Sequence, residues 1–341
     1  MAPDDRAIVV GISRYPELGN LDGPENDARA FEAWLRSPSG GGLQEDHVDR
    51  ILSSDFPPCQ NVVSAKPTTE AVKEAIDKLH FIGESGEARV GRRLYLFMAG
   101  HGFAAGFRDA RLLMANAAAT RTGHHFPGPP YADWFRESAY FNEVVLLMDC
   151  CLENYKFSPL QPCHLDPVTD SGGAKQPVRY YYGLASQFGR AAREVRDDTS
   201  GEIRGVFTAT VLDGLWQGPV GGGDVTGDWL TDFVRTHMPP RLSGQPSQRP
   251  VIDYEPSDDI VFAHCAPTRY QVLIHADPAA QSQEVEMCDG ALNVLPPSGR
   301  SNGTWEWELG PGMYKWRYRG SGDQLRFLEL KGKGRVVDVG L

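Results

Sequence analysis

Residues 94–102 read LYLFMAGHG, and residues 144–151 read VVLLMDCC. Each stretch begins with an apolar run of strand length, which is typical of a strand buried on both faces of a parallel sheet. The first run leads into His101, and the second leads into Cys150 and Cys151. In such sheets the functional residues lie beyond the carboxyl ends of the strands. These two stretches therefore predict both the fold class and the place of a functional site.

Further strands and helices alternate along the chain. Apolar runs predict additional strands, and apolar residues at helical spacing predict helices. We expect strands at residues 7–11, 48–52 and 180–184, and helices at residues 25–35, 68–79, 206–216 and 229–238. This alternation is typical of the α/β class, with a mostly parallel sheet sandwiched by helices.

The C-terminal part of the chain has a different pattern, with a period of two. Residues 305–309 (WEWEL) and 314–319 (YKWRYR) alternate aromatic or apolar residues with charged ones, on either side of the GPG at 310–312. This pattern predicts a β-hairpin with one aromatic face, on whose other face the glutamates and basic residues pair. We therefore expect two domains: residues 1–265 form the α/β domain, and residues 266–341 form a small β-sandwich.

The composition disfavours several classes of protein. Of the 341 residues, 41% are hydrophobic and 23% charged, which is typical of a folded chain rather than a disordered one. No apolar stretch approaches the ~18–20 residues of a membrane span, so we expect no membrane partner. The net charge of −11, all of it within residues 1–265, disfavours nucleic acid as a partner. Six cysteines are too few for a disulfide scaffold, and residues 1–6 lack the apolar segment of a secretory signal, so we expect a cytoplasmic protein with free thiols.

His101 and one of the two cysteines form a candidate catalytic pair. A thiol becomes a useful nucleophile when a histidine favours its thiolate, and the imidazole can then protonate the leaving amine. The backbone N–H groups of Gly102 and of the cysteine are candidate donors to an oxyanion. The pair therefore predicts hydrolysis of an amide bond. Taken singly, each residue has a structural alternative, because buried cysteines are common at strand ends and most histidines are packed or on the surface.

The chain resembles the caspase-like clan of cysteine peptidases, in particular bacterial caspase-like proteins and metacaspases. The resemblance spans roughly residues 7–262 and is carried by residues 9–12 with Tyr15, residues 21–28 (LDGPENDA), 100–102 (GHG), 149–151 (DCC) and 205–208 (GVFT). His101 and Cys151 are 50 residues apart, which is about the separation found in caspases. The resemblance implies a caspase-like fold and a cysteine endopeptidase that acts on a protein substrate in bacterial signalling or antiviral defence. It also implies an upstream activating protease or a regulatory partner.

The choice of nucleophile follows from the resemblance. Metacaspases carry the reactive thiol two residues after an aspartate, which makes Cys151 the nucleophile and Cys150 its neighbour. Strand alternation also places the two cysteines on opposite faces. Metacaspases continue with His-Ser-Gly, whereas this chain has LEN at residues 152–154. This departure supports an alternative function, a catalytically inactive caspase-like scaffold that binds protein partners.

Substrate specificity is also implied by the resemblance. Caspases use arginines to accept an aspartate before the scissile bond, whereas metacaspases use carboxylates to accept Arg or Lys. Asp27 and Asp149 fall on the metacaspase pocket positions, and two carboxylates favour a cationic guest. Pro24 and Ala99 replace a cysteine and a serine of metacaspase pockets, so the pocket differs in detail. The alternatives are that Asp27, next to Asn26, caps the first helix and that Asp149 only orients its loop.

Metal binding has weaker support. Neither Cys163-His164 nor His124-His125 has the paired spacing of a zinc site, so we expect no metal. By resemblance, calcium is the one cofactor that stays open, since many metacaspases need it. The aspartates available for calcium are Asp109, Asp133, Asp166 and Asp170.

Two segments rich in proline and glycine predict loops, at residues 152–178 and 239–250. Long loops in compact domains are usually functional or disordered. We expect the first of these loops, or the stretch that contains Arg190, Arg193 and Arg196, to be cut if the enzyme is activated by proteolytic processing.

Overall fold

The structure is a computed structural model, and it describes residues 4–85, 89–104, 106, 109–154, 160–166, 177–187, 189–190, 192–196, 201–242, 248–275, 284–319, 325–330 and 336–339. Its chain forms two compact units. The first consists of Met1–Trp216 with Val225–Ala263, and the second of Gln217–Asp224 with His264–Leu341. All of the candidate catalytic and pocket residues belong to the first unit.

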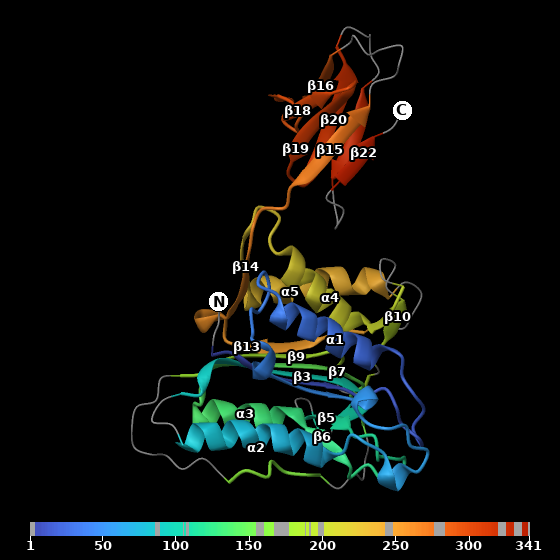
Figure 1. The fold of residues 1–341 in the computed structure, drawn as a ribbon, viewed down its shortest axis with the longest axis vertical. Coiled ribbons are helices and arrows are strands. Elements are labelled where there is room, and N and C mark those ends of the chain that lie inside the picture. The colour runs from blue at the N-terminus through green and yellow to red at the C-terminus, as the bar shows by residue number, and fades with distance from the viewer. Residues whose placement is uncertain are drawn as a thin grey trace. The chain divides into compact units, whose positions relative to one another are not determined.

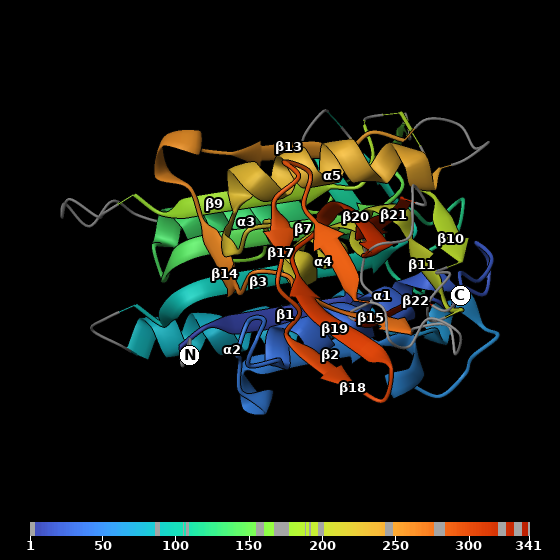
Figure 2. The ribbon, with the colours of Figure 1, turned by 90° about the horizontal axis from the view of Figure 1, so that it is seen from above.

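A six-stranded sheet forms the centre of the first unit. Its order is β13-β9-β7-β3-β1-β2, and every neighbouring pair is parallel except β13 with β9 (Figure 2). The bounds are β1 (Arg6–Gly11), β2 (Val48–Leu52), β3 (Gly91–Gly100), β7 (Phe141–Cys150), β9 (Arg179–Leu184) and β13 (Val251–Tyr254). The mostly parallel sheet and its predicted strands are therefore confirmed. Strand β13 is an antiparallel edge strand that the apolar pattern does not predict.

Helices cover both faces of this sheet (Figure 1). The helices α2 (Thr69–Ser85) and α3 (Gly128–Ser138) lie on one face, and α1 (Gly23–Arg36), α4 (Val206–Gln217) and α5 (Gly227–Arg241) lie on the other. The α/β class with helices on both faces is therefore confirmed. None of the helices in the described part of the chain is long and apolar enough to cross a membrane.

The helix boundaries follow local sequence in most places. Helix α1 buries Ala28, Phe31, Trp34 and Leu35, which are the residues whose helical spacing predicts it. Helix α3 is not predicted, because it begins with Gly-Pro-Pro, although proline is well tolerated in a first turn. Helix α5 extends over Pro239 and Pro240 to Arg241, so the predicted start of the 239–250 loop is too early in the chain.

Shorter strands form further small sheets outside the main one. A four-stranded sheet has the order β6-β5-β4-β8, and β10 pairs with β11 and β12 with β14. The bounds are β4 (Gly102–Ala104), β5 (Ala110–Leu113), β6 (His125–Pro127), β8 (Glu153–Asn154), β10 (Glu194–Arg196), β11 (Ile203–Gly205), β12 (Gly223–Thr226) and β14 (Val261–Cys265). The β10–β11 hairpin lies at the end of the sheet where β1, β3 and β7 finish (Figure 2). It is therefore placed to contact residues that follow those strands.

The second unit contains two four-stranded sheets, with the orders β18-β19-β15-β22 and β17-β16-β20-β21. The bounds are β15 (Tyr270–His275), β16 (Val285–Cys288), β17 (Val294–Leu295), β18 (Gly299–Ser301), β19 (Thr304–Leu309), β20 (Gly312–Tyr318), β21 (Arg326–Leu330) and β22 (Val336–Val339). Buried residues from both sheets, including Trp307 of β19 and Trp316 of β20, belong to one hydrophobic cluster. Both sheets therefore contribute to the same core.

The predicted hairpin of β19 and β20 is wrong. Strand β19 pairs with β15 and β18, whereas β20 pairs with β16 and β21. The chain passes from one sheet to the other at Gly310 and Pro311, and the aromatic residues of both strands still enter one core. A period of two identifies the buried face of a strand, but it does not identify the strand's partner.

The charged rows of these strands have other partners for the same reason. The Nη2 of Arg317 lies 2.7 Å from an oxygen of Glu286, and the Nη1 of Arg319 lies 2.8 Å from an oxygen of Glu284, so both pair with the β16 side. Glu306 of β19 accepts a hydrogen bond from Gln271 of β15 at 3.0 Å. The expected pairing of the β19 glutamates with the β20 basic residues is therefore wrong.

Candidate active site

His101 and Cys151 follow the ends of two neighbouring strands. Strands β3 and β7 are parallel, with Gly100 opposite Cys150. His101 directly follows Gly100, and Cys151 directly follows Cys150. The register alone therefore brings the two candidate catalytic residues to the same edge of the sheet, as the sequence predicts.

The loop between β1 and α1 holds His101. The Nε2 of His101 bonds to the carbonyl oxygen of Gly19 at 2.9 Å, and the N–H of His101 donates to the Tyr15 hydroxyl at 3.0 Å. That hydroxyl donates to the carbonyl of Leu113 at 2.9 Å. Because a carbonyl oxygen only accepts, Nε2 carries the proton, which leaves Nδ1 of a neutral imidazole free to accept one.

Gly100 is required for this arrangement. Its φ of +154° is rarely adopted by residues with a side chain, and a Cβ at this position would collide with the Tyr15 hydroxyl. That hydroxyl is the group that accepts the His101 N–H. The glycine before the histidine therefore allows the loop to approach the strand end closely.

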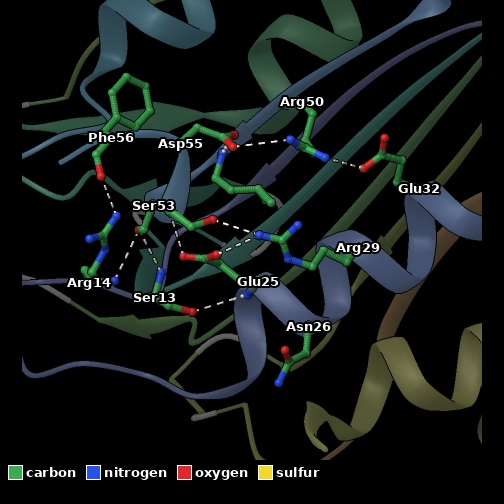
Figure 3. A network of polar contacts seen from close by, with 12 residues as sticks. Ser13, Arg14, Glu25, Asn26, Arg29, Glu32, Arg50, Ser53, Asp55 and Phe56 are labelled. Atoms are coloured by element: carbon green, nitrogen blue, oxygen red, sulfur yellow. Dashed lines mark hydrogen bonds and ion pairs between the residues drawn. The ribbon is translucent and has the colours of Figure 1, made fainter. Parts of the chain in front are cut away.

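A polar network fixes the same loop from the side of β2 (Figure 3). The buried Ser53 hydroxyl accepts the N–H groups of Ser13 at 3.1 Å and Arg14 at 3.2 Å. The Ser13 hydroxyl accepts the N–H of Glu25, in the first turn of α1, at 3.3 Å. The loop that contacts His101 is thus tied to both β2 and α1.

The two adjacent cysteines have different environments, as strand alternation predicts. Cys150 is 1% exposed, and a Cβ on Gly102 would lie only 2.7 Å from its Sγ. Burial raises the pKa of the Cys150 thiol well above its usual value, and the charges of Cys151 and Asp149 raise it further. Cys151 is partly exposed, and its Sγ accepts the N–H of Ala192 at 3.3 Å. Of the two thiols, that of Cys151 is therefore the one accessible to a substrate.

Gly102 directs its N–H away from β5. It lies opposite Leu112 in the antiparallel β4–β5 pair, and the N–H of Leu113 donates to the His101 carbonyl at 2.8 Å. In an antiparallel ladder, this bond makes the adjacent Gly102–Leu112 pair a non-hydrogen-bonded one. The N–H groups of such a pair point away from the partner strand. This direction is the one that the predicted role of Gly102 as an oxyanion donor requires.

The segment after β9 runs beside the candidate nucleophile. The N–H of Leu152 donates to the Arg190 carbonyl at 2.9 Å, and the N–H of Gly189 donates to the Leu152 carbonyl at 2.7 Å. The N–H of Arg193 donates to the Gln248 side chain at 2.9 Å. The stretch suggested for activation cleavage is therefore hydrogen-bonded beside the site at two of its arginines. Its cleavage remains a prediction.

The structure brings Asp27 and Asp149 together at Gly205. The Oδ2 of Asp27 accepts the N–H of Gly205 at 2.8 Å, and the Oδ2 of Asp149 accepts the N–H and hydroxyl of Thr208 at 3.0 and 2.7 Å. A Cβ on Gly205 would collide with Asp149 and lie 2.9 Å from the Oδ2 of Asp27. The two carboxylates, which are 2% and 7% exposed, thus lie side by side although they are far apart in sequence.

The two alternative roles of these aspartates have different outcomes. Helix α1 begins at Gly23 with Asp22 as its N-cap, so the suggested capping of this helix by Asp27 is wrong. Asp149, by contrast, does orient another segment, because it accepts two hydrogen bonds from Thr208 in the first turn of α4. A negative charge at that end of a helix is favourable.

Burial makes both carboxylates hard to ionise. It raises the pKa of Asp149 to about 6, although the hydrogen bonds from Thr208 lower it. Burial, followed by the charge of Asp149, raises the pKa of Asp27 well above its usual value, against a smaller opposite effect of Arg204. The Oδ1 of Asp27 is buried and has no hydrogen-bond partner among the described residues. The pair therefore offers an unused acceptor to a cation or donor.

Comparisons with known proteins give similarity at the level of structure. No protein-family model matches the sequence, and no curated protein matches it. The chain is similar to a caspase-1 from Spodoptera frugiperda, with 15% identity and a TM-score of 0.46 over 77% of this chain and 90% of that one. It is also similar to a protein from Geobacter sulfurreducens, with 14% identity and a TM-score of 0.46 over 78% and 98% of the two chains.

Glu194 is a third carboxylate at the site. Its Oε1 accepts the N–H of Gly23 at 3.1 Å. Burial raises the pKa of Glu194, whereas hydrogen bonds from Gly23 and Asp22 and the charge of His101 lower it. The sequence does not single this residue out, because the three-residue strands β10 and β11 contain charged residues and no apolar pattern.

The candidate metal ligands have other partners. The Nδ1 of His125 donates to the Thr122 carbonyl at 2.7 Å, and its Nε2 accepts the N–H of Gln161 at 3.0 Å. The Nε2 of His164 donates to Asp77 at 2.6 Å, and its Nδ1 accepts the Tyr131 hydroxyl at 2.7 Å. Both rings are thus used in protein contacts. Within the described ranges, no cluster of His, Cys, Asp and Glu has the arrangement of a metal site.

The aspartates considered for calcium lie apart, on different elements. Asp109 accepts a hydrogen bond from Arg111 at 2.9 Å, and Asp133 accepts one from Tyr182 at 3.1 Å. The carbonyl of Asp166 accepts the indole N–H of Trp134 at 2.8 Å. Asp170 lies outside the described residues. These contacts do not assemble the aspartates into one site.

Proposed function

We propose that this chain is a cysteine endopeptidase in which Cys151 is the nucleophile and His101 the general acid and base. The observation that carries the proposal is the register of β3 and β7, which places Gly100 beside Cys150. A thiol and an imidazole then follow adjacent strand ends, at the edge where parallel sheets present their functional residues. The partial exposure of Cys151, in contrast to buried Cys150, supports the choice of nucleophile.

The geometry around His101 supports a specific division of roles. Because the Gly19 carbonyl fixes the proton on Nε2, Nδ1 takes the proton of the Cys151 thiol. The thiolate then attacks the scissile carbonyl carbon, and Nδ1 returns the proton to the leaving amine. The N–H of Gly102, directed away from β5, and the N–H of Cys151 are the donors that we assign to the oxyanion. Water then hydrolyses the acyl-enzyme.

The substrate that we propose is a protein cut after a basic residue. Asp27 and Asp149 lie side by side, and the Oδ1 of Asp27 lacks a partner in the described structure. Burial disfavours the ionised form of these carboxylates, and the positive charge of a basic P1 side chain favours it. An aspartate at P1 would instead bring a like charge into a desolvated site.

A binding scaffold without catalytic activity is the second candidate. Two observations favour it: the Sγ of Cys151 already accepts the N–H of Ala192, and Asp149 already holds Thr208. Both contacts suit a purely structural site. If the chain is a scaffold, the Cys151 thiol should react no faster than the thiol of Cys59. Cys59 is also partly exposed, and it is far in sequence from the strand ends that carry the candidate dyad.

One experiment separates the two candidates. The full chain is treated with an arginyl chloromethylketone and, separately, with iodoacetamide, and labelled cysteines are identified by mass spectrometry. The endopeptidase predicts selective labelling of Cys151 by the chloromethylketone, loss of that label in His101→Ala, and hydrolysis of fluorogenic peptides with Arg or Lys at P1. Equal labelling of Cys151 and Cys59, with no hydrolysis of any peptide in a P1-varied library, would establish the scaffold.

A further inference from the structure

Residues 160–166, the linker segment, lie on the connection between β8 and β9 and are held through their backbone. The N–H of Gln161 donates to the Nε2 of His125 at 3.0 Å, and the Gln161 carbonyl accepts the Nη1 of Arg111 at 2.8 Å. Cys163 packs against the hydrophobic core of the first unit. Two side chains of the β6-β5-β4-β8 sheet therefore hold one residue of the connection that follows the candidate nucleophile.

His125 makes these contacts as a neutral ring. It is fully buried, and its Nδ1 donates to the Thr122 carbonyl at 2.7 Å. Its Nε2 faces two donors, the N–H of Gln161 and the Nη1 of Arg111, each at 3.0 Å. A second proton, on Nε2, would point a third donor at these two. Protonation of His125 is therefore incompatible with the hydrogen bond to Gln161.

The charged groups around the ring do not remove this conflict. The Arg111 guanidinium of β5 places a positive charge at Nε2, and its Nη2 binds the Asp109 carboxylate at 2.9 Å. Burial lowers the pKa of His125, and the charges of Arg111 and His124 lower it further. The hydrogen bond to the backbone and the charge of Asp109 raise this pKa only in part. The buried site therefore favours the neutral ring.

His125 also packs beside the strands that continue from both candidate catalytic residues. Its imidazole lies edge-on to the Phe103 ring of β4, with 5.1 Å between the ring centroids. Strand β4 begins at Gly102, whose N–H we assign to the oxyanion. Phe103 in turn pairs with Glu153 of β8, the short strand that follows the candidate nucleophile. A change at His125 therefore acts directly on β4 and, through it, on β8.

We propose that His125 is a positioning residue that holds the linker segment only while its ring is neutral, an inference that rests on the proposed endopeptidase function. When the ring takes up a proton, the Gln161 N–H loses its acceptor and this end of the segment is released. The far end stays in place, because His164 pairs with Asp77 at 2.6 Å and gains from its own protonation. The release removes packing from β4, so the oxyanion donor of Gly102 is held less firmly and hydrolysis slows. The change occurs as the pH falls below about 6.5, the usual pKa of histidine.

The first test measures the exposure of Cys163 and does not depend on activity. The full chain, with Cys151→Ala, is labelled with 4,4′-dithiodipyridine, which reacts with thiols in mild acid, and the modified cysteines are identified by mass spectrometry. Cys59, which is also partly exposed, is the internal reference. We expect the labelling ratio of Cys163 to Cys59 to rise by about tenfold between about pH 7.5 and 5.

Two variants assign this rise to one ring. His125→Gln keeps an acceptor for the Gln161 N–H and a donor for the backbone carbonyl, but it does not titrate, so its labelling ratio should stay nearly constant. His124→Gln is the matched control, because it removes the neighbouring ring, which contacts Arg121 at 2.8 Å instead. This control should show the same rise as wild type.

The second test measures kcat/KM for a peptide with citrulline, the neutral isostere of arginine, at P1. Between about pH 7.5 and 5, wild type should lose about tenfold more activity than His125→Gln, and His124→Gln should follow wild type. A constant labelling ratio in wild type, or a rise that persists in His125→Gln, overturns the proposal, and so do identical pH profiles of these two enzymes. If no peptide is cut, the endopeptidase fails, and a rise in labelling that depends on His125 still upholds the release of the linker segment.

Discussion

The N–H of Ala192 donates a hydrogen bond to the Sγ of Cys151 at 3.3 Å. This bond is accompanied by a contact of the Cys151 thiol with the Ala192 carbonyl oxygen at 4.0 Å. The hydrogen bond joins the candidate nucleophile to the segment that leads, two residues later, into Glu194 of the β10–β11 hairpin. The segment after β9 therefore supports both the nucleophile and the group of carboxylates.

Substitution of the two cysteines should separate catalysis from stability. We expect Cys151→Ala to abolish peptide hydrolysis and to leave the free energy of unfolding almost unchanged. Cys150→Ser should keep most of the activity but lower the free energy of unfolding by about 1–3 kcal/mol, because it buries a hydroxyl in the apolar core. Hydrolysis of one arginine peptide and urea denaturation measure the two effects. An inactive Cys150→Ser with an active Cys151→Ala would mean that the register is shifted by one residue.

Tyr15→Phe should slow catalysis without changing specificity. The Tyr15 hydroxyl accepts the His101 N–H and donates to the Leu113 carbonyl, so its removal leaves a partly buried N–H and a buried carbonyl without this partner. We expect kcat to fall by about tenfold, with an unchanged ratio between arginine and citrulline peptides. A change in that ratio at constant kcat would show that the loop acts on the pocket rather than on the histidine.

The central sheet and the candidate dyad can be predicted from sequence because their signals are local. Each buried strand is a continuous apolar run, and His101 and Cys151 follow such runs directly. The parallel arrangement then follows from the alternation of strands with helices. The structure adds the exact register of Gly100 with Cys150, which no local pattern contains.

The rest of the site depends on contacts between distant segments. Gly19, Ala192 and Gly205 act through their backbone groups, which leave no mark on side-chain chemistry. Glu194 lies in a strand of three residues, too short for a periodic signal. The sequence predicts the wrong partner for β19 for a related reason, since alternation specifies which face is buried but not the neighbouring strand.

The C-terminal unit should be dispensable for chemistry if the chain is cut at the right residue. Buried Arg93 donates to the Val261 carbonyl at 2.6 Å and pairs with Glu143, so the backbone of Val261 is bound to a buried side chain of the first unit. We expect a chain ending at Cys265 to fold and to cleave short peptides at a rate within about threefold of the full chain. A chain ending at Asp259 removes that acceptor and should lose about 1–3 kcal/mol or fail to fold. An inactive but folded chain ending at Cys265 would show that the second unit completes the active site.

Asp149→Asn should be more stable than wild type at neutral pH. The pKa of Asp149 is raised by burial from 3.8 to about 6, so the folded state holds this proton more tightly than the unfolded state. Its stabilising effect is complete below about pH 4 and is lost as the pH rises through about 6, by about 3 kcal/mol in total. Asparagine still accepts the Thr208 N–H but does not ionise. Urea denaturation at about pH 4.5 and 7.5 should show the variant gaining relative to wild type as pH rises. A constant difference would contradict the raised pKa.

The preference for a basic P1 residue should itself depend on pH. Arginine is bound best when the buried acids are ionised, and the raised pKa values of Asp27 and Asp149 mean that protons must leave them first. The ratio of kcat/KM for arginine and citrulline peptides should therefore rise by about tenfold between about pH 5 and 7.5. An effect of pH on the chemical step is common to both peptides and cancels in the ratio. Asp27→Ala should flatten this rise and lower the preference, while arginine remains at least ~10²-fold better than aspartate in wild type. Efficient cleavage after aspartate, or an Asp27→Ala enzyme with an unchanged preference, would leave the dyad in place and remove the acidic pocket.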